Sequence, residues 1–202
     1  YLSRNQPEDA VKSMKLVFES EEIDADSKFR VLNDFLLFVN ENPEYKEDLL
    51  EVSQLLSGQE DSPLLFEQLG NYYLENGMRK DALLYFETAL AENSENFELF
   101  RNTIVLQLEF EQYAAALENS QQALDLYPGQ PLLYLFKGVA HNKLGEYGRA
   151  DEILTFGLDY VIDNRQLLAD FYNQLSIAAK GLGNISKAEE YTRKLEELKK
   201  QE

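Results

Sequence analysis

The residues of this chain that could perform acid–base or metal chemistry are one histidine, His141, and a large excess of carboxylates. The chain has 37 Asp and Glu against 19 Lys and Arg, and it has no cysteine. A lone histidine cannot build a histidine-cluster zinc site, and the absence of cysteine excludes thiolate chemistry and disulfides. Nucleophilic catalysis needs a nucleophile, a base and an orienting group within reach of one another. No such set is recognisable, so we expect His141 to be structural.

Pairs of adjacent carboxylates offer a second possible chemistry. A glycosidase or a metal site needs carboxylates that converge across a cleft, which adjacency in sequence does not supply. We therefore expect these pairs to lie on solvated helix faces, and a carboxylate-based enzyme in a helical cleft is the least favoured hypothesis. No metal and no cofactor are expected. The pairs are Glu21-Glu22, Glu60-Asp61, Asp151-Glu152, Glu189-Glu190 and Glu196-Glu197.

Small residues that recur at one interval indicate the helices that position His141 and the carboxylates. Ala82, Ala116 and Ala150 are spaced by 116 − 82 = 34 and 150 − 116 = 34 residues. Such a period is typical of repeat proteins, in which each helix pair buries its apolar face against its neighbours. Two further sets keep the same interval: Ala89, Ala123 and Gly157, and Phe66, Phe100 and Tyr134.

The segment from Ser62 to Ser94 resembles a tetratricopeptide repeat. The matching positions are Phe66, where the family prefers Trp, followed by Leu69, Gly70, Tyr73, Ala82, Phe86 and Ala89. Weaker copies follow, and the fourth is displaced, because Ala188 lies 188 − 150 = 38 residues after Ala150. We expect the extra residues to lengthen the connection at 159–168. The resemblance covers roughly residues 62–198.

The resemblance implies an all-α fold, a right-handed α-solenoid of antiparallel helix pairs with about eleven helices. The predicted repeats span about 62–95, 96–129, 130–164 and 165–202. Residues 1–61 are predicted to add three degenerate helices to the same stack: Pro7–Glu19, Phe29–Val39 and Tyr45–Leu56. Gly77, Gly145 and Gly183 are expected to end the first helices of three pairs in the left-handed conformation.

In this family the concave groove is lined mainly by first-helix residues that face away from the second helix. Asn71 and Arg101 suit a clamp for a peptide's terminal carboxylate, but Glu67 replaces an expected cation, so that function is not carried over. The predicted partner-binding residues are Leu64, Asn71, Arg101, Val105, Leu108, Leu132, Leu135, Val139, Asn142, Asn173 and Ile177. The same geometry also places Leu74, Glu75, Glu98, Glu109, Lys143, Asp170 and Lys180 along the groove.

The formal net charge of −18 bounds the class of partner. A field of this sign repels phosphate backbones and anionic membranes, and no apolar stretch approaches the roughly 20 residues of a membrane span. The charge therefore favours a neutral or basic polypeptide partner. The resemblance, together with the lack of a catalytic set, implies a scaffold that binds such a protein or peptide without chemistry of its own. The alternative is a structural module that forms homo-oligomers.

The compartment stays open from the sequence alone. The chain begins at Tyr1 rather than Met, so we expect a fragment or a processed form, and such a start is compatible with a targeting segment that has been removed. The resemblance favours a bacterial protein of the cytoplasm or of the periplasm and cell envelope.

Overall fold

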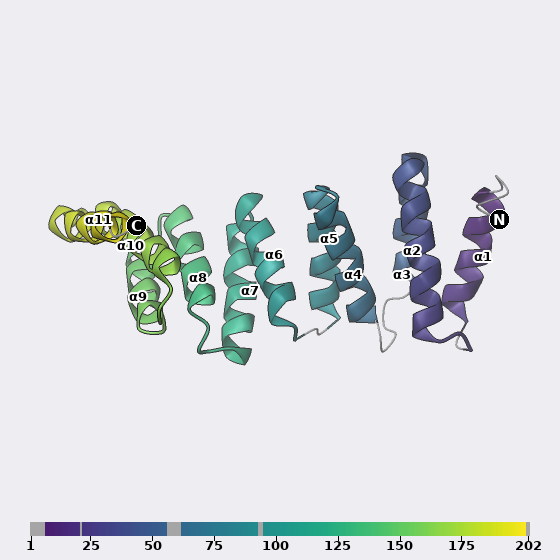
Figure 1. Ribbon diagram of the computed structural model, residues 1–202, viewed down its shortest axis with the longest axis horizontal. Coiled ribbons are helices and arrows are strands. Elements are labelled where there is room, and N and C mark those ends of the chain that lie inside the picture. Colours follow the sequence, from purple (N-terminus) through teal and green to yellow (C-terminus); the bar gives the residue numbers. More distant parts are fainter. Residues whose placement is uncertain (1–6, 21, 56–61, 93–94, 201–202) are drawn as a thin grey trace. The chain divides into compact units, whose positions relative to one another are not determined.

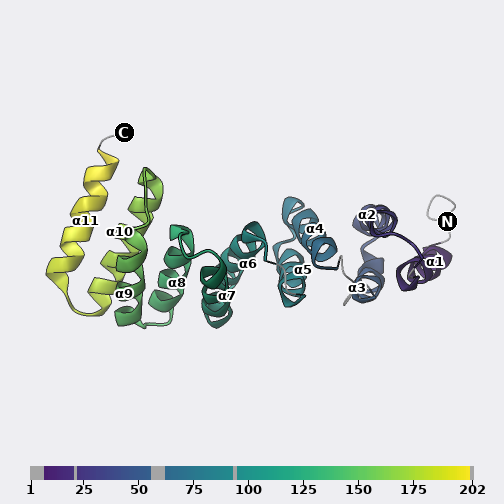
Figure 2. The ribbon, with the colours of Figure 1, turned by 90° about the horizontal axis from the view of Figure 1, so that it is seen from below.

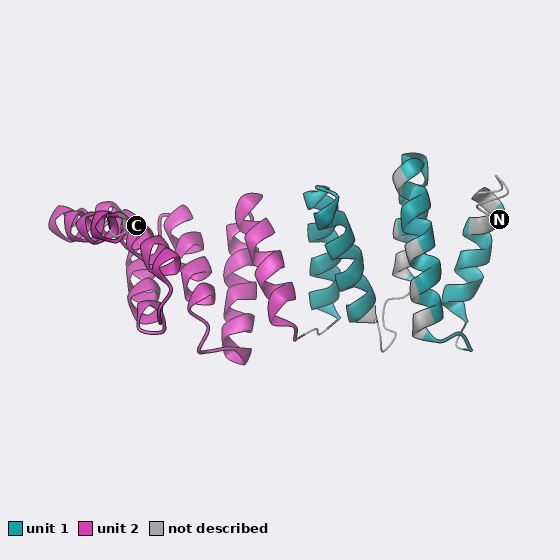
Figure 3. Cartoon of the chain, viewed as in Figure 1, with its two compact units in different colours: residues 1–94 teal, residues 95–202 magenta. Residues whose placement is uncertain are grey.

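The computed structural model describes residues 7–20, 22–55, 62–92 and 95–200. Within these ranges the chain forms eleven α-helices, α1 to α11, and the short 3-10 helix η2, and it contains no strand. The expected all-α class and number of helices are therefore confirmed. The chain divides into two compact units, residues 1–94 and 95–202, which Figure 3 distinguishes by colour.

The first unit contains three helices without consensus residues and one clear helix pair. Asp24 begins the second helix by accepting a 2.8 Å hydrogen bond from the Ser27 backbone N–H. That helix ends at Glu41, before Asn42 and Pro43, because the residue before proline disfavours the helical conformation. The elements are α1 (Pro7–Glu19), α2 (Ala25–Glu41), η2 (Pro43–Tyr45), α3 (Lys46–Gln54), α4 (Ser62–Glu75) and α5 (Arg79–Ala91).

The α4–α5 pair shows why the repeat needs a glycine. A Cβ built on Gly70 would lie 2.3 Å from the Phe86 ring, so only glycine allows this approach. Beside this contact, Tyr73 stacks on Tyr85 with ring centroids 5.3 Å apart, and both are buried. The glycine costs about 1 kcal/mol of helix propensity relative to alanine, which the close packing offsets.

The second unit consists of three successive helix pairs (Figures 1 and 2). The members of each pair pack together, and each later first helix also packs on the first helix of the pair before it, so that α6, α8 and α10 form one layer. The elements are α6 (Phe97–Glu109), α7 (Tyr113–Leu126), α8 (Pro131–Lys143), α9 (Tyr147–Leu158), α10 (Arg165–Gly181) and α11 (Ile185–Lys199).

The turns within the helix pairs confirm the expected left-handed glycines. Gly77, Gly145 and Gly183 have φ of 74°, 74° and 73°. In the α6–α7 turn the same place, 77 + 34 = 111, is taken by Glu111, which adopts φ 60°. This conformation is uncommon for a residue with a Cβ, so the second repeat tolerates a strain that the others avoid.

The connection between α9 and α10 is shorter than expected. The connection from α9 covers only 159–164, because α10 begins at Arg165 and runs for 17 residues against 13 in α8. The Asn164 side chain accepts a 2.9 Å hydrogen bond from the Leu167 N–H and caps this longer helix. The predicted loop residues 165–168 are therefore the first turn of α10.

Candidate functional site

A pocket of about 280 Å³ lies in the second unit where α6, α8 and α10 meet. We call it the groove pocket. Its lining contains five of the predicted partner-binding residues and also Asp170 from the wider predicted set. It is lined by Val105, Leu108, Leu135, Phe136, Val139, Asp170, Asn173 and Gln174.

Helical spacing explains why each helix contributes more than one side chain. Val105 and Leu108 lie three residues apart on α6, and Leu135 and Val139 lie four apart on α8. Residues at these separations share one helix face. The packing of α8 against both α6 and α10 then brings the three faces together.

The floor of the groove pocket is apolar and the α10 side is polar. Val105 is 38% exposed, whereas Leu135 is only 7% exposed and belongs as much to the core as to the surface. Leu108 and Val139 are half-buried, and Asn173 is exposed. This arrangement can seat an apolar side chain beside groups that form hydrogen bonds.

Two lining residues, Phe136 and Gln174, are absent from the predicted set. Each follows a predicted residue directly, Leu135 and Asn173 respectively. The consensus positions identify the centre of the helix face that points into the groove. They do not indicate whether the rotation of the neighbouring helices brings the flanking side chains to the edge of the groove.

Asn142, which is predicted to line the groove, lies at the contact between α8 and α10. Its Nδ2 donates to the backbone oxygen of Gln174 at 2.9 Å and to Gln174 Oε1 at 3.0 Å. The side chain is buried, and its Oδ1 has no hydrogen-bond partner. Asn142 thus holds the two first helices together and is not part of the pocket lining.

The other predicted residues lie outside the groove pocket. Arg101 pairs with Glu98, with Nη2 and Oε2 2.7 Å apart, and also donates to Asn102 Oδ1. Leu132 is half-buried on α8, and Ile177 is 39% exposed on α10. Two residues belong to α4 in the first unit, where Leu64 is 55% exposed and Asn71 is half-buried.

His141 is buried between helices, as expected for a structural residue. Its Nδ1 lies 2.7 Å from Glu146 Oε2, and Glu146 Oε1 accepts from Arg149 Nη1 at 3.0 Å. The hydrogen bond from His141, followed by that from Arg149, lowers the pKa of Glu146. The cluster joins the end of α8 to the start of α9 and has no nucleophile within it.

The carboxylate pairs do not converge in the part of the chain that the structure describes. Asp151 binds Lys187 Nζ through both oxygens at 2.8 Å, and Glu190 pairs with Lys194 at 2.7 Å. Hydrogen bonds from Ser27, His141 and Lys194 lower the pKa values of Asp24, Glu146 and Glu190 respectively. Glu21 and the pair Glu60-Asp61 lie outside the described residues.

Residues 7–20, 22–55, 62–92 and 95–200 hold no group of three or more His, Cys, Asp or Glu side chains that could bind a metal ion. None of the helices described there has the length and apolarity needed to cross a membrane.

Solved structures similar to this chain are helical repeat proteins. YrrB, a TPR protein with an unusual peptide-binding site, has a TM-score of 0.65 at 21% identity, with 93% of each chain covered. The "41-end" piece of MamA from Desulfovibrio magneticus RS-1 has a TM-score of 0.62 at 15% identity, with 86% of this chain and 96% of that chain covered. The first TPR domain of Spaghetti (RPAP3), bound to an HSP90 peptide, has a TM-score of 0.52 at 19% identity, with 60% and 93% covered.

No protein-family model and no curated protein matches the sequence. The likeness to solved structures therefore shows the fold alone. The chain has the TPR-like fold, an all-α solenoid of helix pairs, as the sequence predicts.

Proposed function

We propose that this chain is a non-catalytic scaffold that binds a protein or peptide in the groove pocket. The observation that carries the proposal is the meeting of Val105, Leu108, Leu135, Val139 and Asn173 from three helices around one hollow. Two structural neighbours are peptide binders by their descriptions, YrrB and the Spaghetti domain. Their fold supports the proposal, and their ligands are not transferred to this chain.

The chemistry of the groove pocket suits a segment that carries an apolar side chain. Burying such a side chain removes apolar area from water, at roughly 25 cal/mol per Å². The exposed amide of Asn173 and the partly exposed Asp170 can meet polar groups of the same segment. An extended peptide or the apolar face of an amphipathic helix satisfies both requirements.

The charge of the chain favours a neutral or basic partner. With a net charge of −18, the chain attracts cationic polypeptides at long range, and the attraction weakens as salt screens it. Arg101, which suits a carboxylate clamp in sequence, is already paired with Glu98. We therefore do not expect a peptide's terminal carboxylate to be the main recognition element.

A matched pair of variants tests the proposal. A displayed library of short random peptides is selected on the full chain, on Val105→Glu and on Leu126→Glu. Val105 and Leu126 are 38% and 42% exposed, but only Val105 lines the groove pocket. We expect Val105→Glu to lose the enriched peptides and Leu126→Glu to keep them, with unchanged thermal unfolding in both. Equal enrichment on Val105→Glu would reject the groove pocket as the binding surface.

A partly exposed aromatic cluster supports a second candidate function, self-association. The Tyr134, Phe156 and Tyr160 rings lie within 5.6 Å of one another, and Phe156 is 53% exposed. Ile162, which follows them in sequence, is 81% exposed. Clustered exposed apolar groups often mark a protein–protein contact.

Sedimentation at two concentrations tests this second candidate. Self-association predicts a mass that rises with concentration and returns to the monomer in Phe156→Glu. Leu144→Glu, at a residue that is 46% exposed, is the control. A monomer at both concentrations excludes the oligomer.

A further inference from the structure

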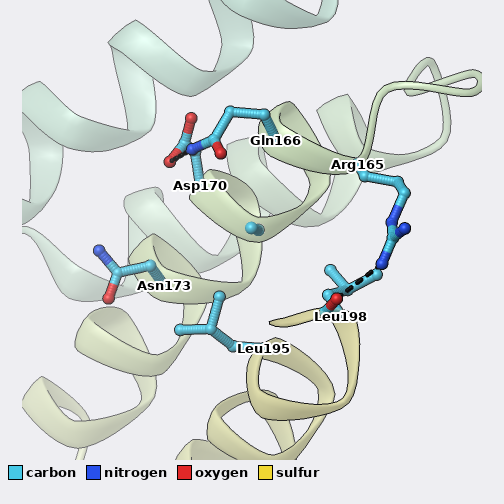
Figure 4. Close-up of a pocket in the computed structure, with 7 residues that line it drawn as sticks. Arg165, Gln166, Asp170, Asn173, Leu195 and Leu198 are labelled. Atoms are coloured by element: carbon cyan, nitrogen blue, oxygen red, sulfur yellow. Dashed lines mark hydrogen bonds between the residues drawn. The ribbon is translucent and has the colours of Figure 1, made fainter. Parts of the chain in front are cut away.

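A second hollow adjoins the groove pocket on the far side of α10. It has a volume of about 690 Å³ and lies between α10 and α11, and we call it the terminal pocket (Figure 4). Asp170 and Asn173 line both pockets, so they form a polar ridge between two hollows of the same unit. The terminal pocket is lined by Arg165, Gln166, Ala169, Asp170, Asn173, Leu195 and Leu198.

Both hollows offer apolar side chains beside the polar ridge, although the terminal pocket is the more polar of the two. The groove pocket has an apolar floor from α6 and α8, and the terminal pocket receives Ala169 from α10 with Leu195 and Leu198 from α11. Both leucines are half-buried, so each presents part of its side chain to the terminal pocket. A ligand that crosses the ridge would therefore meet apolar surface, then a carboxylate and an amide, then apolar surface again.

The Asp170 carboxylate on the ridge is suited to receive a cation. Its Oδ1 accepts a long 3.2 Å hydrogen bond from Gln166 Nε2, one turn earlier on the helix. Arg165 is turned the other way, because its Nη2 donates to the backbone oxygen of Leu198 at 2.6 Å (Figure 4). Asp170 is half-buried, and a half-buried carboxylate attracts a cation more strongly than one fully surrounded by water.

The α11 side of the terminal pocket differs from the equivalent position in the preceding helix pair, α8–α9. In the preceding pair, a Cβ on Gly157 would lie 2.2 Å from Tyr134 and 3.1 Å from Phe171 of the next first helix. The equivalent position on α11, 157 + 38 = 195, holds Leu195. Leu195 therefore supplies an aliphatic side chain at a position where α9 has none, and this side chain lines the terminal pocket.

We propose that the binding groove continues from the groove pocket over α10 into the terminal pocket, and that it recognises an extended peptide of apolar–basic–apolar pattern. One apolar side chain occupies each pocket, and the Lys or Arg between them pairs with Asp170 while Asn173 binds the peptide backbone. This inference rests on the proposed function and specifies its ligand. Charge-assisted hydrogen bonds are the stronger class, so the basic residue supplies much of the selectivity.

Peptide selection on further variants tests this inference. The random-peptide library is selected on the full chain and on Asp170→Asn, with Asp159→Asn as a control that changes the net charge equally at an exposed site in the α9–α10 connection. We expect wild type and Asp159→Asn to enrich a basic residue flanked by apolar residues. Asp170→Asn should lose the basic preference, and a synthetic Lys-centred peptide from the selection should bind it about tenfold more weakly.

The terminal pocket is tested separately with Leu195→Ala, whose folding is checked by circular dichroism. This variant should bind the same Lys-centred peptide more weakly than wild type does. The inference is overturned if peptides lost on Val105→Glu lack a basic residue, if Asp170→Asn keeps the preference, or if a folded Leu195→Ala binds normally. In each of these cases the proposed function still stands, whereas enrichment of no peptide at all would reject both.

Discussion

At the scale of single residues, the absence of a side chain at helix crossings determines how closely the helices of a pair pack. A Cβ on Gly138 would lie 2.3 Å from both Cγ and Cδ2 of Leu154, as one on Gly70 would from Phe86. The alanines that recur at the same interval, Ala82, Ala116 and Ala150, are all fully buried. Their periodicity was visible in the sequence because each repeat meets the same steric requirement.

We predict that Gly138→Ala destabilises the chain although alanine is the better helix former. The added methyl must displace the Leu154 side chain, and overpacking of this kind costs about 1–3 kcal/mol. Chemical denaturation followed by circular dichroism measures the change. Gly148→Ala in α9 is the matched control, because its Cβ meets nothing within 4 Å, and it should gain up to about 1 kcal/mol. Equal effects in the two variants would contradict this account.

Side-chain pairing between repeats could not be predicted from the sequence. Asn142 and Gln174 are separated by 32 residues, and their hydrogen bonds depend on the exact rotation of α8 and α10. Five predicted residues line the groove pocket because consensus residues mark the opposite face of each first helix, and their role in binding a partner stays a prediction. The burial of Leu135 and the inward placement of Asn142 were not, because both depend on the angle between neighbouring helices.

At the scale of helices, the turns were more predictable than the helix lengths. Glycine marks the end of a first helix because the left-handed conformation is required there. The additional turn of α10 was not predicted, because Asp163 and Asn164 are equally typical of a loop and of a helix start. The hydrogen bond from the Leu167 N–H to Asn164 Oδ1 shows which of these applies.

The contact between α8 and α9 predicts a pH dependence of stability. The pKa of Glu146 is lowered below its ordinary value of 4.5 by the hydrogen bond from His141 and then by that from Arg149. Its stabilisation is therefore present above about pH 4.5 and is lost as the pH falls through the lower folded-state pKa. Glu146→Gln should be less stable than wild type at neutral pH, and this difference should shrink in acid.

Urea denaturation at several pH values, from neutral to about pH 3, measures this effect. Glu152→Gln is the control, because Glu152 is an exposed carboxylate one turn and a half further along α9. It should follow the wild-type pH dependence. A pH-independent difference between Glu146→Gln and wild type would contradict the assigned role.

At the scale of the whole molecule, the all-α repeat architecture was predictable from the sequence, and the division into two compact units was not. The sequence separates 1–61 from 62–202 because the consensus begins at Ser62, and this division of repeats stays a prediction. The two compact units divide between residues 94 and 95. Consensus residues report packing within one helix pair, whereas the division into units depends on contacts between pairs.

We predict that residues 95–202 fold without the first unit. They form a compact unit with three helix pairs, about the minimum for a stable repeat array. The isolated fragment should show a helical circular dichroism spectrum and a cooperative thermal transition. Because the groove pocket lies wholly within it, the fragment should also select the same peptides as the full chain. An unfolded fragment would show that the first unit is needed for stability.

Helices that pack together lie close together in the sequence, and this affects how the chain folds while it is being synthesised. In each unit the main contacts join helices that are adjacent or next but one along the chain. Such local contacts close short loops and are associated with rapid folding. A nascent chain can therefore fold each helix pair soon after that pair leaves the ribosome. Little apolar surface then stays exposed until distant residues are translated.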